Sequence, residues 1–174
     1  KIKKSYNAMR NPFISKVVLS AGATGNDLEK AAKLLEMISE RKAEIMKSGP
    51  RKRIPAFNVK PDMPLGARVT MRGKASRELL KRLLGAIDNK LKEKQISDNT
   101  FSFGIKEYIE IPGTEYVREI GIRGFNVTVT FERAGTRVKK KKIKAARLPK
   151  KQHVSKDEII KYMEEKFGTA ITEK

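Results

Sequence analysis

The sequence predicts an α+β fold with a mainly antiparallel sheet, helices packed on one face of that sheet and the other face free. Several segments alternate apolar and polar residues with the period of two that is typical of a strand with one buried face. Two longer segments instead repeat Leu, Ile and Ala at the spacing of an amphipathic helix. The 174 residues are 39% hydrophobic, which is enough for one domain to bury its own core.

A strand and a helix are predicted in the first part of the chain. Residues 13–20 follow a proline and are rich in β-branched residues, which predicts a strand that ends in an AGATG turn. Thr24 and Asp27 resemble a capping arrangement. Apolar residues recur at helical spacing from Leu28, which predicts an amphipathic helix to about Arg41.

The next segment combines a short apolar piece, a basic loop and a second strand. Residues 44–47 lead into a loop at 47–55 that contains Gly, Pro and several bases. Residues 57–60 lie between two prolines, which predicts extended backbone there. Residues 67–72 alternate strictly between apolar and polar side chains and therefore predict a strand.

The second half of the chain predicts two helices and two strands. A stripe of leucines over residues 75–92 indicates a long amphipathic helix. Residues 100–111 and 124–133 indicate strands. A capping serine and a stop glycine frame a final short helix at 156–167.

Charge divides the chain into two regions. There are 40 Lys and Arg against 20 Asp and Glu, a net charge of +20. Residues 133–151 contain ten bases and no acid, and such a run is expected to lack fixed structure until a polyanion orders it. We therefore predict an α+β body over residues 1–132, followed over 133–174 by a basic arm and a C-terminal helix that is packed on the body or extends from it.

The composition favours a polyanionic partner. The absence of Cys excludes a disulfide scaffold, a thiol nucleophile and a thiolate zinc site. No apolar run approaches the ~20 residues that span a bilayer, and no signal peptide is evident, so we predict a soluble cytoplasmic protein. Nucleic acid is the leading partner. An anionic membrane surface is the weaker alternative, because the arm has no apolar face to insert.

The free face of the predicted sheet carries bases, hydroxyls and an amide, side chains that suit phosphate and ribose contacts. By alternation its members are Lys16, Arg68, Thr70, Arg72, Asn126, Thr128 and Thr130. We predict that RNA binds there, with an ordinary solvated sheet face as the alternative.

The stretch from Arg123 to Val129, RGFNVTV, begins like the RNP1 signature of RNA-recognition motifs. Val127 and Val129 occupy the later positions, where aromatic residues would stack on bases. Aromatic residues make up only 6% of the chain, so no single-strand stacking platform is expected. RNA would instead be read by shape and backbone, with Arg123 among the candidate contacts.

Two further basic segments are candidates for phosphate contact. The alternative for the loop is a solvated loop, and the alternative for the arm is a nuclear-localisation or membrane-surface segment. The loop at 47–55 gathers Lys47, Arg51, Lys52 and Arg53 around Gly and Pro. In the arm the candidate RNA contacts are Lys139, Lys140, Lys141, Lys142 and Lys144.

Catalysis finds no support in the sequence. His153 is the only histidine, and no carboxylate pair or metal-ligand spacing accompanies it. We predict no enzyme, no cofactor and no metal. An RNA-modifying or RNA-cleaving enzyme that uses His153 is kept as a weak rival hypothesis.

Five blocks of sequence resemble one family, the large-subunit ribosomal protein L five (L5), over about residues 8–170. The blocks are NPFISKVVLSAG, IPAF, MPLGARVTMRG, NTFSFGIKEYIEIPG and GIRGFNVTVTFERAG. The third block is the most specific. The fourth block and the basic segment after the last strand are similar to the archaeal and eukaryotic branch.

The resemblance implies a structural constituent of the large ribosomal subunit. Such a protein binds 5S rRNA, helps attach it to the large rRNA in the central protuberance and touches P-site tRNA through the loop at 47–55. Its other expected partners are neighbouring central-protuberance proteins and a head protein of the small subunit. No homo-oligomer is expected. The resemblance also adds Ser20 to the rRNA-contacting sheet.

A DNA-compacting architectural protein is the alternative function, because the net charge alone permits it.

Overall fold

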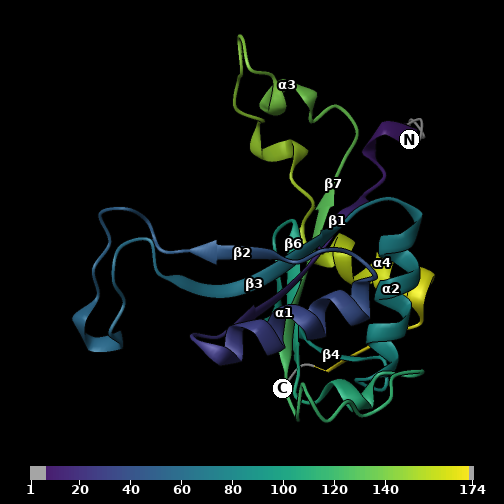
Figure 1. Ribbon diagram of the computed structural model, residues 1–174. Helices are drawn as coiled ribbons and strands as arrows, with labels where there is room; N and C mark the ends of the chain where they lie inside the picture. The colour runs from purple at the N-terminus through teal and green to yellow at the C-terminus, as the bar shows by residue number, and fades with distance from the viewer. Residues whose placement is uncertain (1–6, 173–174) are drawn as a thin grey trace, which may run out of the picture.

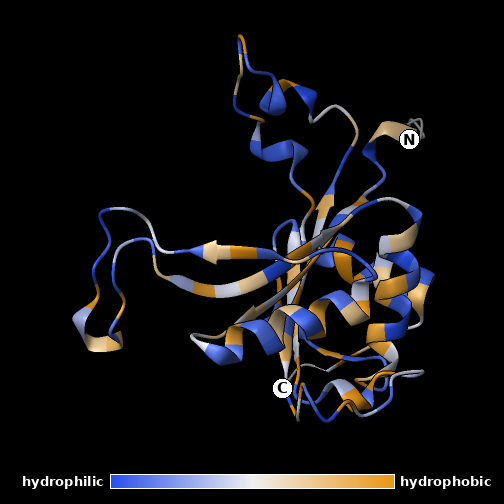
Figure 2. Ribbon diagram, viewed as in Figure 1, coloured by the Kyte–Doolittle hydropathy of each residue, from blue (hydrophilic) through white to orange (hydrophobic). Residues whose placement is uncertain are grey.

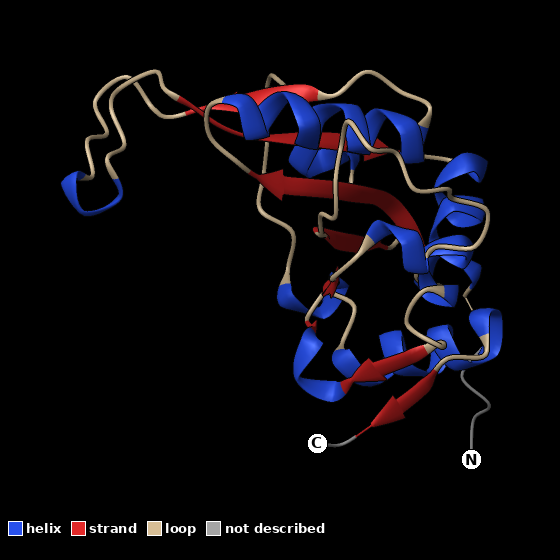
Figure 3. Cartoon of the chain, turned by 60° about the horizontal axis from the view of Figure 1, so that its bottom comes forward, coloured by secondary structure: helices blue, strands red, loops and turns tan. Residues whose placement is uncertain are grey.

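A six-stranded antiparallel sheet forms the centre of the computed structural model, which describes residues 7–172. Its strands follow the order β2-β3-β1-β7-β6-β5. They are β1 (Phe13–Gly22), β2 (Glu44–Lys47), β3 (Pro64–Met71), β5 (Ile96–Ser97), β6 (Thr100–Ile105) and β7 (Phe125–Glu132). A second sheet, at the bottom of the view in Figure 3, pairs β4 (Lys90–Lys92) in parallel with β8 (Ala170–Thr172).

Helices α1, α2 and α4 pack against one face of the large sheet (Figure 1). The α-helices are α1 (Asn26–Ser39), α2 (Lys74–Gly85), α3 (Arg137–Lys140) and α4 (Lys156–Phe167). Short 3₁₀ turns are η1 (Ala8–Arg10), η2 (Pro55–Phe57), η3 (Glu93–Gln95), η4 (Tyr108–Glu110) and η5 (Lys150–Gln152). Among residues 7–172, no helix is long and apolar enough to cross a membrane. The predicted α+β class is confirmed.

Alternation along the three central strands separates the core from the open face. Val17 and Leu19 of β1 are fully buried, and Val69 of β3 and Val127 of β7 lie on the same side as their cross-strand neighbours. The helices contribute their leucine stripes to this one core. A slip of one residue in any strand would turn its apolar set to solvent, so the buried face fixes the register.

Helix α1 begins differently from the prediction. Its N-cap is Gly25, at φ 62°, and no side chain caps the first turn, so the predicted capping role of Thr24 and Asp27 is wrong. Asp27 and Glu29 lie in that first turn, where negative charge is favoured by the helix dipole. The helix ends at Glu40, whose left-handed backbone lets its N–H donate to the Glu36 carbonyl at 2.8 Å.

The long helix predicted over residues 75–92 is wrong beyond residue 85. Helix α2 stops at Gly85, and Asp88 and Asn89 adopt left-handed backbone. The N–H of Asn89 then donates to the Leu84 carbonyl at 2.9 Å, which closes the helix end. Leu91 continues the leucine spacing, but it is buried as the middle residue of β4, against β8 from the far end of the chain.

Two other predicted segments also differ. The strand predicted over 100–111 ends at Ile105, and η4 follows it, where buried Tyr108 accepts a hydrogen bond through its hydroxyl from the Val117 N–H at 2.9 Å. The extended backbone predicted at 57–60 is wrong, because η2 turns there and Asn58 is left-handed. The first strand runs two residues further than predicted, to Gly22.

Two segments project from this body. The chain between β2 and β3 forms a long hairpin, and residues 133–153 form an arm that carries α3 (Figure 1). The arm returns to the body at buried Val154, and α4 then adds Ile159 and Met163 to the core. Ser155 and Gly168 frame α4 as predicted. The division of the chain at residue 132 stays a prediction.

The base of the hairpin gives a stability prediction. A Cβ at Gly66 would lie 2.7 Å from the Ala21 carbonyl oxygen of β1, and one at its partner Gly22 would meet nothing within 4 Å. We expect Gly66→Ala to lower the free energy of unfolding by about 1–3 kcal/mol, and Gly22→Ala to change it by less than about 0.5 kcal/mol. Urea denaturation followed by circular dichroism measures both. Equal effects of the two substitutions would contradict the packing argument.

Candidate nucleic-acid interface

The open face of the sheet brings polar side chains from β3, β1 and β7 into adjacent rows. One row places Ser20 of β1 between Arg68 and Asn126. The next row, two residues along each strand, has two threonines with Val18 between them. Six predicted contacts therefore share one face: Lys16, Ser20, Arg68, Thr70, Asn126 and Thr128. Predicted Thr130 lies beside Lys16 on the same face.

Ion pairs distinguish three arginines among the predicted RNA contacts of the body. Arg68 pairs through Nε with Glu44 of β2 at 2.9 Å, so β2 brings one carboxylate to the edge of the face. Arg72 lies just beyond β3 and is exposed. Arg123 pairs with Asp27 in the first turn of α1. The structure therefore commits Arg123 to a helix contact, whereas Arg72 is presented to solvent.

A hollow at one end of the open face was not predicted. It has a volume of about 520 Å³, and three of its lining residues are glycines: Gly22, Gly104 and Gly124. Ser20 and Asn126 supply polar groups beside it. The sequence feature that could have predicted this hollow is a glycine at or near the end of each of three strands. A glycine has no side chain, so another backbone can approach the sheet closely there.

The basic loop lies far out on the hairpin between β2 and β3. Ser48 donates its N–H to the Met63 carbonyl at 2.8 Å, and Ile54 and Val59 exchange two backbone hydrogen bonds of 3.1 Å. The predicted residues at 51–53 are exposed between these two pairings. The predicted Lys47 is the last residue of β2 and is likewise exposed. Cross-strand hydrogen bonds thus hold the predicted cations away from the body.

The tip of the hairpin also presents apolar surface, which the charge-based prediction missed. Phe57 is 78% exposed and Ile54 is 43% exposed, directly after the basic residues. Figure 2 shows this tip as a hydrophobic segment at the end of a largely hydrophilic hairpin. The apolar run IPAF inside a basic loop was the available signal. An exposed ring beside cations suits a partner with both phosphates and base faces.

The basic arm, expected to lack fixed structure, forms α3 and a return loop. Glu132, at the end of β7, accepts hydrogen bonds from Lys140 at 2.7 Å and from Thr136 at 3.2 Å. The Gln152 side chain donates to the Ala134 carbonyl at 2.8 Å on the returning side. Lys140 is therefore paired, whereas the other predicted lysines of the arm are exposed and have no ion pair among residues 7–172: Lys139, Lys141, Lys142 and Lys144.

The second anchor of the arm is at its return. Buried Arg133 pairs with Glu158 in the first turn of α4. Asn99 accepts a hydrogen bond from the Val154 N–H at 2.8 Å through its side chain and donates its own N–H to the Val154 carbonyl at 3.0 Å. Both ends of the arm are thus held by the folded body.

The part of the chain that the structure describes contains no group of three or more His, Cys, Asp and Glu that could hold a metal ion. His153 is exposed next to η5.

Comparisons with known proteins match this chain to ribosomal proteins. The family model for the C-terminus of the ribosomal L5 family matches residues 64–162. A "Large ribosomal subunit protein uL5" of Methanosphaera stadtmanae is 34% identical over 168 residues, which cover 95% of this chain and 99% of the relative. The proteins of that name from Nanoarchaeum equitans and Sulfolobus acidocaldarius are each 38% identical, over 94% and 98% of this chain and 97% and 96% of the relatives.

The Glu132 anchor generates a pH prediction. Burial of this carboxyl would raise its pKa, but hydrogen bonds from Lys140, Ser15 and Thr136 and the Lys140 charge outweigh burial and lower the pKa below its usual value. The ionised anchor therefore stabilises the folded state above the ordinary glutamate pKa, and this stability is lost as the pH falls through the lowered value. Carboxyl-detected NMR titration of Glu132 measures the shift.

Substitution of Lys140 tests whether its contact with Glu132, and not the general charge of the arm, lowers the pKa of Glu132. Lys140→Gln should move the pKa of Glu132 upward, whereas Lys139→Gln, which removes a neighbouring charge that makes no contact with Glu132, should move it much less. Equal shifts in the two variants would show that the general charge of the arm, and not the contact, sets the pKa.

Proposed function

Because the chain belongs to the L5 family of large-subunit ribosomal proteins, in its archaeal branch, we propose that it binds 5S rRNA through the open face of its sheet. Membership in this family makes the chain a structural protein of the large ribosomal subunit. In this proposal the protein helps attach 5S rRNA to the large rRNA in the central protuberance and has no enzymatic activity.

The arrangement of the open face supports this proposal. Hydroxyl, amide and basic side chains lie in register across β3, β1 and β7, and the glycine-lined hollow continues the face at one end. Hydroxyl and amide groups bond to ribose and phosphate oxygens without reading base identity. A face of this kind recognises the shape of a folded RNA, and the +20 charge of the chain supplies long-range attraction.

The hairpin supports a separate contact, which we assign to P-site tRNA. The hairpin between β2 and β3, which carries the predicted cations and the exposed Phe57, projects well beyond the sheet (Figure 1). The same hairpin therefore reaches a partner that need not touch the open face. The basic arm is proposed to contact large-subunit rRNA. Neighbouring central-protuberance proteins and a small-subunit head protein are the remaining proposed partners.

We expect Arg72→Gln to weaken 5S rRNA binding and to reduce the slope of log K against log salt by about 0.7–0.9, because one phosphate contact is lost. Filter binding of purified 5S rRNA at several salt concentrations measures the slope. Lys30→Gln is the matched control. Lys30 is exposed on α1, and α1 packs against the face of the sheet opposite to the open face. A salt slope near zero for the unmodified protein would overturn the phosphate mechanism.

The same assay separates the ribosomal function from the DNA-compacting alternative. Duplex DNA of equal mass should displace 5S rRNA poorly, because the open face recognises a folded RNA shape. Equal displacement by the two nucleic acids would favour the alternative.

For the hairpin, we expect replacement of Arg51, Lys52 and Arg53 by Ala to weaken retention of P-site tRNA on ribosomes several-fold, since three exposed phosphate-reaching charges are removed. Binding of 5S rRNA should remain within about twofold of that of the unmodified protein. Peptidyl-tRNA retention on sucrose gradients and 5S rRNA filter binding provide the two measurements. Parallel loss of both would show that the two surfaces are not separate.

A further inference from the structure

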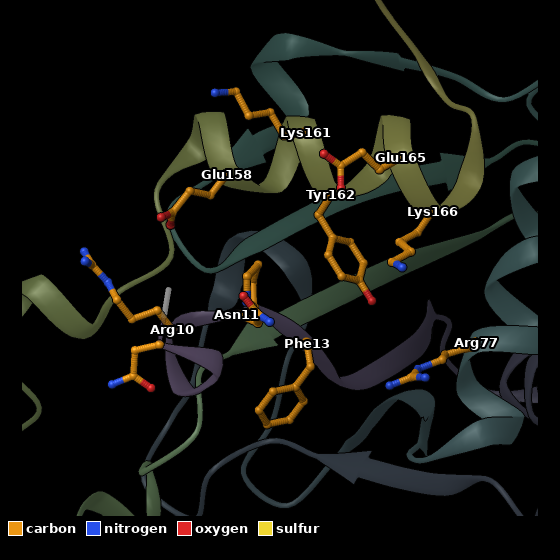
Figure 4. Close-up of a pocket in the computed structure, with 11 residues that line it drawn as sticks. Arg10, Asn11, Phe13, Arg77, Glu158, Lys161, Tyr162, Glu165 and Lys166 are labelled. Carbon is orange, nitrogen blue, oxygen red and sulfur yellow. The ribbon is translucent and has the colours of Figure 1, made fainter. Parts of the chain in front are cut away.

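A cavity of about 750 Å³ lies where β1 begins, between that end of the strand and helices α2 and α4 (Figure 4). Its lining comes from residues 7–13, from Arg77 of α2 and from one side of α4. Helices α2 and α4 cover the face of the sheet opposite to the proposed 5S rRNA surface. The cavity is therefore separate from the open face and from the hairpin.

Two aromatic residues give the cavity apolar surface. Phe13 is 37% exposed at the start of β1. Tyr162 of α4 has its ring centroid 5.4 Å from that of buried Phe131, in an edge-to-face arrangement, and 6.5 Å from that of Phe167. The core thus fixes the Tyr162 ring at the cavity wall, while the Phe13 ring keeps accessible surface for a ligand.

The charged residues around these rings favour an anion. Arg10, Arg77, Lys161 and Lys166 line the cavity together with only two carboxylates, and one of these, Glu158, is paired with Arg133. Within residues 7–172, neither Arg77 nor Lys166 forms an ion pair. In Figure 4, Tyr162 and Lys166 point from α4, and Arg77 from α2, into the same space.

We propose that this cavity binds one unpaired nucleotide of an RNA. A cavity lined by an accessible aromatic ring and two unpaired cations suits a nucleotide, because the base can stack on the ring while its phosphate meets the cations. An acidic peptide would use the cations but leave the Phe13 ring without a stacking partner. The inference rests on the proposed RNA-binding function and adds to it a single-nucleotide site on the helix-covered side.

This site differs from the stacking platform that the sequence excludes. A platform of the RNA-recognition type needs several aromatic residues along the open face of a sheet, and here Val127 and Val129 are buried on the other face. The cavity instead joins one strand end to two helices that lie far apart in the sequence.

The full chain with a fluorescein-labelled single-stranded RNA hexamer of mixed sequence provides the test, at a salt concentration that suppresses non-specific binding. Phe13→Leu keeps an apolar side chain but removes the ring, and we expect it to weaken hexamer binding about tenfold. Arg77→Gln and Lys166→Gln should each weaken it several-fold. Lys30→Gln, which removes one charge from α1 outside the cavity, should leave the affinity within about twofold.

NMR shift mapping with the same hexamer locates the site independently of affinity. Perturbation centred on Phe13, Arg77 and Tyr162 supports the proposal, and perturbation confined to the open face or the arm overturns it. Displacement of the hexamer by an equal concentration of a hexaglutamate peptide also overturns it, in favour of a protein ligand. If 5S rRNA binds while the hexamer leaves the cavity unperturbed, this inference fails and the proposed function stands. If 5S rRNA does not bind either, the proposed function itself fails.

Discussion

The alternation of side chains along β1, strict from Lys16 to Gly22, is the constraint on which the rest of the structure depends. β1 is central, with β3 on one side and β7 on the other, so its register fixes theirs. Val17 and Leu19 turn toward the helices, and Lys16 and Ser20, which flank them in the strand, turn to the open face. A single strand thereby decides both where the helices dock and which polar groups can meet RNA.

The ionic contacts show that net charge overstates the surface available to a polyanion. Several acids are used to hold particular bases in place: Asp27 holds Arg123, Glu132 holds Lys140 and Glu158 holds Arg133. These pairs join β7 and the residues that flank it to helix α1, to the arm and to helix α4. Among the described residues, the bases of the hairpin, most bases of the arm and Arg72 just beyond β3 have no acidic partner, and these segments carry part of the proposed RNA contacts.

Local patterns predict most of this architecture, because the central strands alternate and two helices carry clear apolar stripes. The predictions fail where contacts with residues far away in the sequence determine the local structure. Leu91 fits a helical stripe, yet it belongs to β4 because β8, from the last residues described, pairs with it. The sequence makes Arg123 a candidate RNA contact, but its guanidinium pairs with Asp27, almost a hundred residues earlier in the chain. Phe57 escapes prediction because charge, and not exposure, guides the interpretation of a basic loop.

The two anchors of the basic arm have a topological consequence. A chain end can thread through a closed opening in a folded RNA, but residues 133–153 are a loop whose ends, at Glu132 and Val154, are both fixed in the body. The arm can therefore enter only a groove wide enough for two chain segments side by side, and it must enter from the outside. The proposed contact of the arm with large-subunit rRNA is therefore made by a loop anchored at both ends and not by a free tail.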